Sequence, residues 1–218
     1  HECAVVSDNQ RIDYQDFYVF AKKLSYVLYH EYHLRSGQHV ALFCRNHFVS
    51  ALLLPALSRL GVNVKLLNTD LSNEQLLQLM SRPFALFIYD KELLQVENID
   101  ISCPQVSCES LLETIKEQLL TDNVVLPYIT RGGNISVMTG GSSGNYKEAA
   151  RQTGIVQFLP PFFSLLRDLH IDSYRSVLIG LPFYHGFGLA TLIISLVMGK
   201  KICLLRHFNA EKVLKIVA

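Results

Sequence analysis

The chain has 218 residues, 50% of them hydrophobic, and its 20 Lys and Arg residues nearly balance its 19 Asp and Glu residues. This apolar content is sufficient for a real core, in one domain or in two small ones. A formal charge of +1, without any basic run, excludes the electrostatic footprint of a nucleic-acid-binding protein.

The first part of the chain alternates between apolar strands and amphipathic helices. Asp13 can cap a helix whose apolar residues, from Phe17 to Leu28, recur at helical spacing. Ser72-x-x-Gln75 is a capping box that opens another helix. The strands are continuous apolar runs, which are typical of strands buried on both faces of a sheet. We expect strands at 4–7, 40–44, 62–67 and 85–89, and helices after Asp13, at about 47–60 before a glycine stop at Gly61, and at about 73–81.

The second part begins less regularly. Residues 90–108 have no clear pattern, residues 110–120 are typical of a surface helix with mixed charges, and residues 121–133 are typical of a loop. An apolar run at 135–138 then leads into a glycine-rich stretch. Beyond it we expect a strongly apolar helix at 156–169, a strand at 177–180, a helix at 189–198 that Gly199 ends, a strand at 202–205 and a helix that Asn209 caps.

This alternation predicts an α/β fold with two related, mostly parallel β-sheets and helices on both faces. The relation between the sheets follows from an internal repeat, because residues 40–80 and 177–218 share the order strand, helix, glycine, strand, helix. Ligands bind outside the carboxyl ends of the strands in such folds. Arg45-Asn46, the glycine-rich stretch and Tyr184-His185 all lie just after predicted strands.

Both ends of the sequence look cut, since it starts at His1 and stops at Ala218 inside a predicted helix, so we expect part of a longer protein. No signal peptide is visible, and the apolar runs are too short to cross a bilayer. The five cysteines form no C-x-x-C pattern and have no histidine at metal-site spacing. We therefore expect free thiols, no metal site and a cytoplasmic location.

The glycine-rich stretch, residues 138–147, combines glycines, hydroxyl groups and Lys147, and it contains no acidic residue. Glycines let backbone N–H groups turn inward, and with hydroxyls and an ammonium they form a nest for a polyanion such as triphosphate. The stretch matches neither the Walker pattern nor the dinucleotide-binding pattern. Its letters Gly140-x-Ser142-x-Gly144 do match the nucleophile elbow of hydrolases. A plain surface turn is a third interpretation.

Several segments resemble the adenylate-forming enzymes, which include acyl-CoA synthetases, luciferases and peptide-synthetase adenylation domains. Residues 139–147 are similar to their phosphate loop, T-S-G-T-T-G-x-P-K, and residues 181–189 to their segment L-P-L-[FY]-H-x-x-G-L. Residues 37–42, 56–61 and 68–71 follow the family's early pattern in order and spacing. Residues 148–151 and 158–162 look most like the fatty-acyl-CoA synthetase branches. The loop departs from the family pattern at Gly140, Tyr146 and Glu148.

The resemblance implies an incomplete N-terminal AMP-binding domain at 1–218, with subdomain one at about 1–130 and part of subdomain two at about 131–218. The implied enzyme is an AMP-forming ligase that activates a carboxylic acid, most similar to a fatty acid, and passes it to CoA or a carrier-protein thiol. ATP and Mg²⁺ are its implied cofactors. The family's magnesium-binding glutamate, ribose-binding aspartate and catalytic lysine would follow Ala218, so the chain alone is expected to be inactive.

Site residues are carried over from the same resemblance. The phosphate loop would hold the departing β- and γ-phosphates of ATP, and Tyr184-His185 would form a gate beside the nucleotide and acyl pockets, with His185 as the catalytic residue. Each role has a structural alternative. Lys147 would be a solvated turn lysine, His185 would bond to loop carbonyls, and the apolar residues of the acyl pocket would be plain core. The implied cofactor-binding residues are Thr139, Gly140, Gly141, Ser142, Ser143, Gly144 and Lys147. The implied substrate-binding residues are Tyr184, His185, Gly186, Phe187 and Gly188.

Two other functions fit parts of the sequence. A serine esterase of the α/β-hydrolase type would use Ser142 as nucleophile, His185 or His207 as base, and Asp168 or Asp172 as the orienting acid. Against it, residues 144–146 are a poor start for the helix that a nucleophile elbow requires. The third function is a non-catalytic module, whose apolar residues 158–166 could touch a membrane or another domain.

Overall fold

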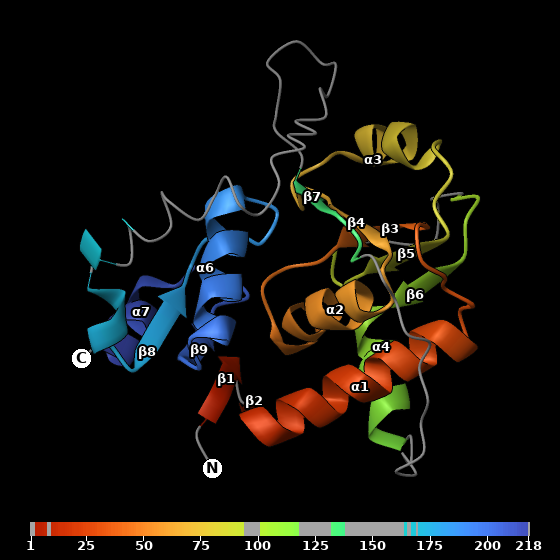
Figure 1. Cartoon of the computed structure of the whole chain (residues 1–218). Helices are drawn as coiled ribbons and strands as arrows, with labels where there is room; N and C mark the ends of the chain where they lie inside the picture. The colour runs from red at the N-terminus through yellow and green to blue at the C-terminus, as the bar shows by residue number, and fades with distance from the viewer. Residues whose placement is uncertain are drawn as a thin grey trace.

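The computed structural model describes residues 3–7, 10–93, 101–117, 132–137, 164, 167–168 and 170–217, in which strands and helices alternate (Figure 1). The strands are β1 (Cys3–Ser7), β2 (Gln10–Asp13), β3 (His39–Phe43), β4 (Asn63–Leu66), β5 (Leu86–Tyr89), β6 (Gln105–Ser107), β7 (Ile135–Val137), β8 (Ser176–Ile179) and β9 (Lys201–Leu204). The helices are α1 (Tyr14–His30), α2 (Phe48–Arg59), α3 (Asn73–Met80), α4 (Cys108–Glu117), α6 (Gly186–Val197) and α7 (Ala210–Val217).

The first sheet is wholly parallel, with its strands in the order β6-β5-β3-β4-β7. Alternate residues of a strand point to opposite faces, and β3 shows this directly. Val40 and Leu42 belong to the core shared with α1, α2 and α4, whereas Ala41 and Phe43 belong to the core shared with α3. This confirms that the continuous apolar run of β3 is buried on both faces.

The second sheet has the order β2-β1-β9-β8, in which β1–β9 and β9–β8 are parallel and the β1–β2 hairpin is antiparallel. The predicted α/β class with mostly parallel sheets is therefore confirmed. Figure 1 shows the red β1 and β2 beside the blue β8 and β9, so this sheet joins the start of the chain to its end. The division into subdomains near residue 130 stays a prediction.

The internal repeat is visible as two parallel strand pairs, each joined through a helix. β3 pairs with β4 across α2, and β8 pairs with β9 across α6. Each helix is followed by a glycine in the left-handed region, Gly61 at φ 68° and Gly199 at φ 64°. Asn68 and Arg206 then lie two residues beyond the ends of β4 and β9.

Four elements differ from the sequence predictions. β2 is absent from them, because its four residues include only one apolar side chain, Ile12. β6 is absent from the prediction, because a three-residue strand is too short to show a period. α4 buries Cys108, Leu111 and Ile115 and is therefore not a free surface helix. α6 begins at Gly186, three residues before the predicted start at Leu189. Two glycines in its first turn, both poor helix formers, hide that start in the sequence.

Some expectations fall on residues that the structure does not describe. These are the glycine-rich stretch at 138–147, the loop at 121–131 and most of the apolar helix at 156–169. Within the described residues, no helix combines the length and the apolar content that a membrane span requires.

Candidate functional site

The segment between β8 and α6, residues 181–185, is fixed to the first sheet by one buried side chain. Asn46 follows β3, and its Nδ2 donates to the Leu181 carbonyl at 2.7 Å. The Phe183 N–H donates to Asn46 Oδ1 at 2.9 Å. The side-chain amide of Asn46 thus pairs with the backbone of the segment as another backbone amide would. It holds residues 181–185 in a fixed position beside the carboxyl end of β3.

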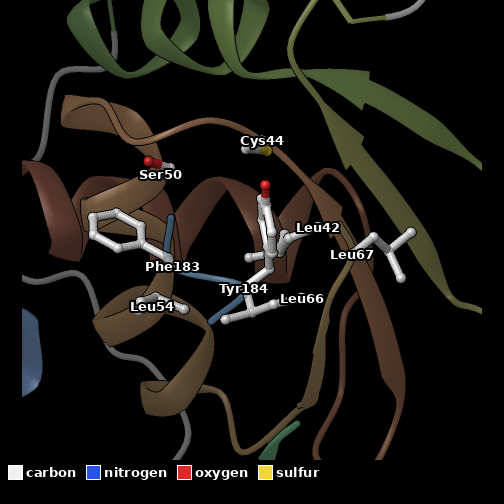
Figure 2. Close-up of a pocket in the computed structure, with 8 residues that line it drawn as sticks. All are labelled: Leu42, Cys44, Ser50, Leu54, Leu66, Leu67, Phe183 and Tyr184. Atoms are coloured by element: carbon white, nitrogen blue, oxygen red, sulfur yellow. The ribbon is translucent and has the colours of Figure 1, made fainter. Parts of the chain in front are cut away.

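Tyr184 points into the first sheet. Its ring is 7% exposed, and Thr69 donates a hydrogen bond to its hydroxyl at 3.4 Å. Around it lies a small cavity with room for about one water molecule. The lining side chains come from β3, α2, β4 and the segment itself: Leu42, Cys44, Ser50, Leu54, Leu66, Leu67, Phe183 and Tyr184 (Figure 2). Tyr184 therefore serves as an apolar anchor whose hydroxyl is satisfied.

His185, the next residue, is exposed to solvent. It is the N-cap residue of α6 without a side-chain cap bond, and its ring centroid lies 4.8 Å from that of Tyr184. Gly186 and Phe187 are exposed with it, and Phe187 is 60% exposed. Gly188 is buried, and a Cβ there would lie 2.3 Å from the Pro182 carbonyl oxygen. Of residues 184–188, Tyr184 is thus a buried anchor, residues 185–187 are exposed together, and Gly188 lies close to the Pro182 carbonyl.

The glycine-rich stretch follows β7 directly. The structure does not describe the stretch itself, but it does describe β7, the strand that precedes it. Val137, the last described residue before it, pairs with Leu66 of β4, and Leu66 lines the cavity around Tyr184. β7 therefore ends at the carboxyl edge of the first sheet, next to β4.

A second cluster of polar side chains surrounds Asp90, which follows β5 and is fully buried. His47 Nε2 lies 2.7 Å from Asp90 Oδ1, and the Arg45 N–H donates to Oδ2 at 2.8 Å. Arg206 lies 3.7 Å from the same Oδ2 and also contacts Glu92 and Glu109. Burial alone would raise the pKa of Asp90, but His47, the Arg45 N–H and Arg206 outweigh it and lower the pKa.

His47 is held in this cluster by the helix that it opens. Its Nδ1 accepts the N–H groups of Val49 and Ser50 and so caps α2. Because Nδ1 accepts, the hydrogen-bond pattern assigns the ring proton to Nε2, which donates to Asp90. The sequence places a helix start at His47, but no rule of sequence patterns predicts a histidine as its cap.

Two thiols lie beside Asp90. The sulfurs of Cys44, after β3, and Cys108, at the start of α4, are 3.3 Å apart. Burial raises the pKa of both thiols, that of Cys108 more strongly. All five cysteines of the chain are free. This pair was hidden in the sequence because its members lie 64 positions apart.

The residues of a hydrolase site are not brought together in the described part of the chain. Asp168 pairs with the adjacent Arg167 at 3.0 Å, and Asp172 lies exposed in the turn before β8. His207 lies 3.5 Å from Glu92. Within the described residues, no hydrogen bond joins either aspartate to His185 or His207, so neither aspartate orients one of these histidines as a base.

The model of the AMP-binding enzyme family matches residues 1–218. The chain belongs to the AMP-binding enzyme family, as its resemblance to adenylate-forming enzymes indicated. A solved structure, O-succinylbenzoate coenzyme A synthetase from Bacillus subtilis in complex with AMP, shares the fold. It has a TM-score of 0.81 and 22% identity, and the match covers 99% of this chain and 55% of that chain.

Two further relatives extend the comparison. The same Bacillus subtilis enzyme in complex with ATP and magnesium ion matches at a TM-score of 0.77 and 22% identity, over 99% of this chain and 56% of that chain. The 2-succinylbenzoate–CoA ligase of Bacillus licheniformis is 27% identical over 225 residues, which cover 97% of this chain and 43% of the relative. The chain thus spans about half of the length of the relatives that it matches.

The fatty-acid expectation finds no support among the curated relatives. The four that match are 2-succinylbenzoate–CoA ligases. Family membership also disfavours the esterase, since it accounts for the entire chain, including Lys147, without a serine nucleophile.

Proposed function

We propose that the chain is part of a CoA ligase that uses ATP to activate a carboxylic acid as acyl-AMP and passes the acyl group to CoA. The observation that carries this proposal is the match of the AMP-binding family model over all 218 residues. The position of the glycine-rich stretch after β7 supports it, because ligands bind at the carboxyl edge of parallel sheets.

The phosphate-binding residues proposed are those of the glycine-rich stretch. Its donor set fits a triphosphate, since hydroxyls, glycine N–H groups and Lys147 can face the anion while no carboxylate repels it. Negative charge moves onto the β- and γ-phosphates as pyrophosphate leaves. Fixed donors favour this step because they need little reorganisation as the charge develops. The stretch has no carboxylate ligand for Mg²⁺, so a carboxylate ligand is proposed elsewhere in the full-length protein.

The acyl end of the site is proposed at the start of α6. His185, Gly186 and Phe187 are exposed together there, on a segment that Asn46 and Tyr184 fix to the first sheet. A fixed segment can present an imidazole and an aromatic ring to an acid without first becoming ordered. His185 is proposed as the catalytic residue that contacts the reacting carboxylate, and Gly188 as the residue that permits the close approach of α6.

The acid is proposed to be an aromatic keto acid of the 2-succinylbenzoate type. The support is that the matching curated relatives are 2-succinylbenzoate–CoA ligases. Fatty acids are the second candidate, because residues 148–151 and 158–162 look like the fatty-acyl branches.

ATP–pyrophosphate exchange by the full-length protein tests the proposal. We expect exchange that depends on 2-succinylbenzoate, followed by AMP release that depends on CoA. Exchange with dodecanoate alone would keep the ligase but move the substrate to fatty acids. No exchange with either acid, together with fluorophosphonate labelling of Ser142, would replace the ligase by the esterase.

A further inference from the structure

Three side chains that commonly bind metal ions converge at the carboxyl edge of the first sheet. Cys44 follows β3, Asp90 follows β5, and Cys108 follows β6 as the first residue of α4. These strands are neighbours in the order β6-β5-β3, so their carboxyl ends meet at one edge. The ligand atoms of the three residues are buried and all lie within 4.8 Å of one another.

We propose that Cys44, Asp90 and Cys108 bind one divalent ion of the zinc class. Two thiolates with a carboxylate are a ligand set that selects Zn²⁺ over the hard ions Mg²⁺ and Ca²⁺. Two sulfurs bound to Zn²⁺ at about 2.3 Å in a tetrahedron lie about 3.7 Å apart. The sulfurs of Cys44 and Cys108 are 3.3 Å apart, so a small outward movement of either side chain accommodates the ion.

Three protein ligands leave the fourth position of a tetrahedral ion for water, as in open zinc sites. Cys44 also lines the cavity around Tyr184, which has room for about one water molecule. The site therefore has the three protein ligands and a neighbouring space of the size that a fourth, exchangeable ligand needs.

The carboxylate is oriented by its own partners. Asp90 Oδ1 accepts from His47 Nε2, and Oδ2 accepts from the Arg45 N–H. His47 is fixed in turn because its Nδ1 caps α2. Hydrogen bonds of this kind to a ligating carboxylate hold it in place and tune metal affinity.

A positive side chain lies beside the excess negative charge that the ligands carry with the ion bound. On binding, both thiols release their protons to solvent, and the three anionic ligands then exceed the two charges of the ion by one. Arg206, 3.7 Å from Asp90 Oδ2, faces this negative charge, and Glu92 and Glu109 hold its guanidinium in position. The site does not depend on the proposed ligase activity, because it shares no residue with the glycine-rich stretch or with residues 181–188.

Titration of the reduced chain with Co²⁺ in the absence of oxygen tests the proposal. Tetrahedral Co²⁺ bound to thiolates gives visible d–d bands and an ultraviolet charge-transfer band, and Zn²⁺ should abolish both by displacement. We expect one ion per chain. Cys44→Ser and Cys108→Ser should each weaken the charge-transfer band and lower affinity, whereas Cys103→Ser, a thiol outside the cluster, should leave both unchanged.

The variant His47→Asn tests whether His47 orients the Asp90 ligand, without disturbing the start of α2. Asparagine is a good N-cap and keeps the start of α2, but it removes the Nε2 bond to Asp90. We expect metal affinity to fall about 10–100-fold with the far-ultraviolet circular dichroism unchanged. The proposal is overturned if the reduced wild-type chain shows no Co²⁺ bands, or if Cys44→Ser and Cys108→Ser, where folded, bind as tightly as wild type.

Discussion

The side-chain amide of Asn46 and the backbone of Phe183 are joined by a 2.9 Å hydrogen bond across 137 positions of sequence. With the 2.7 Å bond from Asn46 to the Leu181 carbonyl, it anchors the 181–185 segment to the edge of the first sheet. Asn46→Ala leaves the buried Phe183 N–H and the partly buried Leu181 C=O without this partner. We expect a loss of about 1–3 kcal/mol in the free energy of unfolding, measured with urea. Gln78→Ala, on the exposed face of α3, is the control and should change stability by less than about 0.5 kcal/mol. Equal values for both variants would contradict this role of Asn46.

Gly188 and Gly186 offer a matched pair in the first turn of α6. A Cβ on Gly188 would lie 2.3 Å from the Pro182 oxygen and 2.7 Å from the Leu181 oxygen, whereas one on Gly186 meets nothing within 4 Å. We expect Gly188→Ala to destabilise the chain by about 1–3 kcal/mol, as overpacking does. Gly186→Ala should be neutral or stabilise by up to about 1 kcal/mol, because it removes backbone freedom in the unfolded state. Thermal unfolding of both variants is the measurement, and the opposite order would show that α6 does not approach these carbonyls.

Tyr184 and His185 are adjacent, but their burial predicts different defects. Tyr184→Ala removes a buried ring and should cost about 3–5 kcal/mol of stability. Tyr184→Phe loses only the long bond from Thr69 and should cost about 1 kcal/mol or less. His185→Ala should leave the unfolding midpoint unchanged while it lowers kcat for acyl-AMP formation in the full-length protein. If His185→Ala leaves kcat intact, the proposed catalytic role of His185 is wrong.

Lys147 is expected to contact phosphate if the glycine-rich stretch binds ATP. A charge-assisted bond of this kind is worth roughly 1.5–3 kcal/mol. Lys147→Ala should therefore lower kcat/KM for ATP in the full-length protein about ten- to a hundred-fold. Ser142→Ala should cost less, because neighbouring hydroxyls and N–H groups share its contacts. Steady-state pyrophosphate release is the measurement, with circular dichroism as the folding control. Loss of all activity in Ser142→Ala beside a normal Lys147→Ala would favour the esterase.

The chain alone should form no acyl-AMP, since it spans only 43% of the Bacillus licheniformis relative. Incubation with ATP, Mg²⁺ and either 2-succinylbenzoate or a fatty acid, with hydroxylamine as the trap, should give no hydroxamate above background. The full-length protein under the same conditions is the positive control. Hydroxamate from the chain itself would mean that these residues hold a complete catalytic set.

The order of the elements is readable from the sequence because local chemistry dictates it. Residues 40–43 are apolar at every position and form a strand buried on both faces, Asp13 and Ser72 cap the helices that they predict, and Gly61 ends α2 in the left-handed region. The phosphate-loop assignment rests on local pattern as well, but the described residues do not include that stretch, so it stays a prediction.

Long-range contacts are what the sequence cannot show. The bonds of Asn46 to the 181–185 segment, and the meeting of Cys44 with Cys108, depend on which strands become neighbours. No local pattern encodes that order. The absence of a C-x-x-C pattern suggested that the chain has no metal site, yet ligands that follow three separate strands leave no such spacing in the sequence.

The pairing of β1 with β9 has a consequence for synthesis on the ribosome. Val5 pairs with Ile202, so β1 waits until Ile202 has been made before its parallel partner exists. At about 5–20 residues per second, that wait is roughly 10–40 s. Until then β1 and β2 form at most an isolated hairpin, which is marginally stable in water, and the apolar side chains of Ala4 and Val5 stay uncovered. Until β9 has been made, the nascent chain offers an open strand edge, and a chaperone bound to β1 in that period would prevent aggregation.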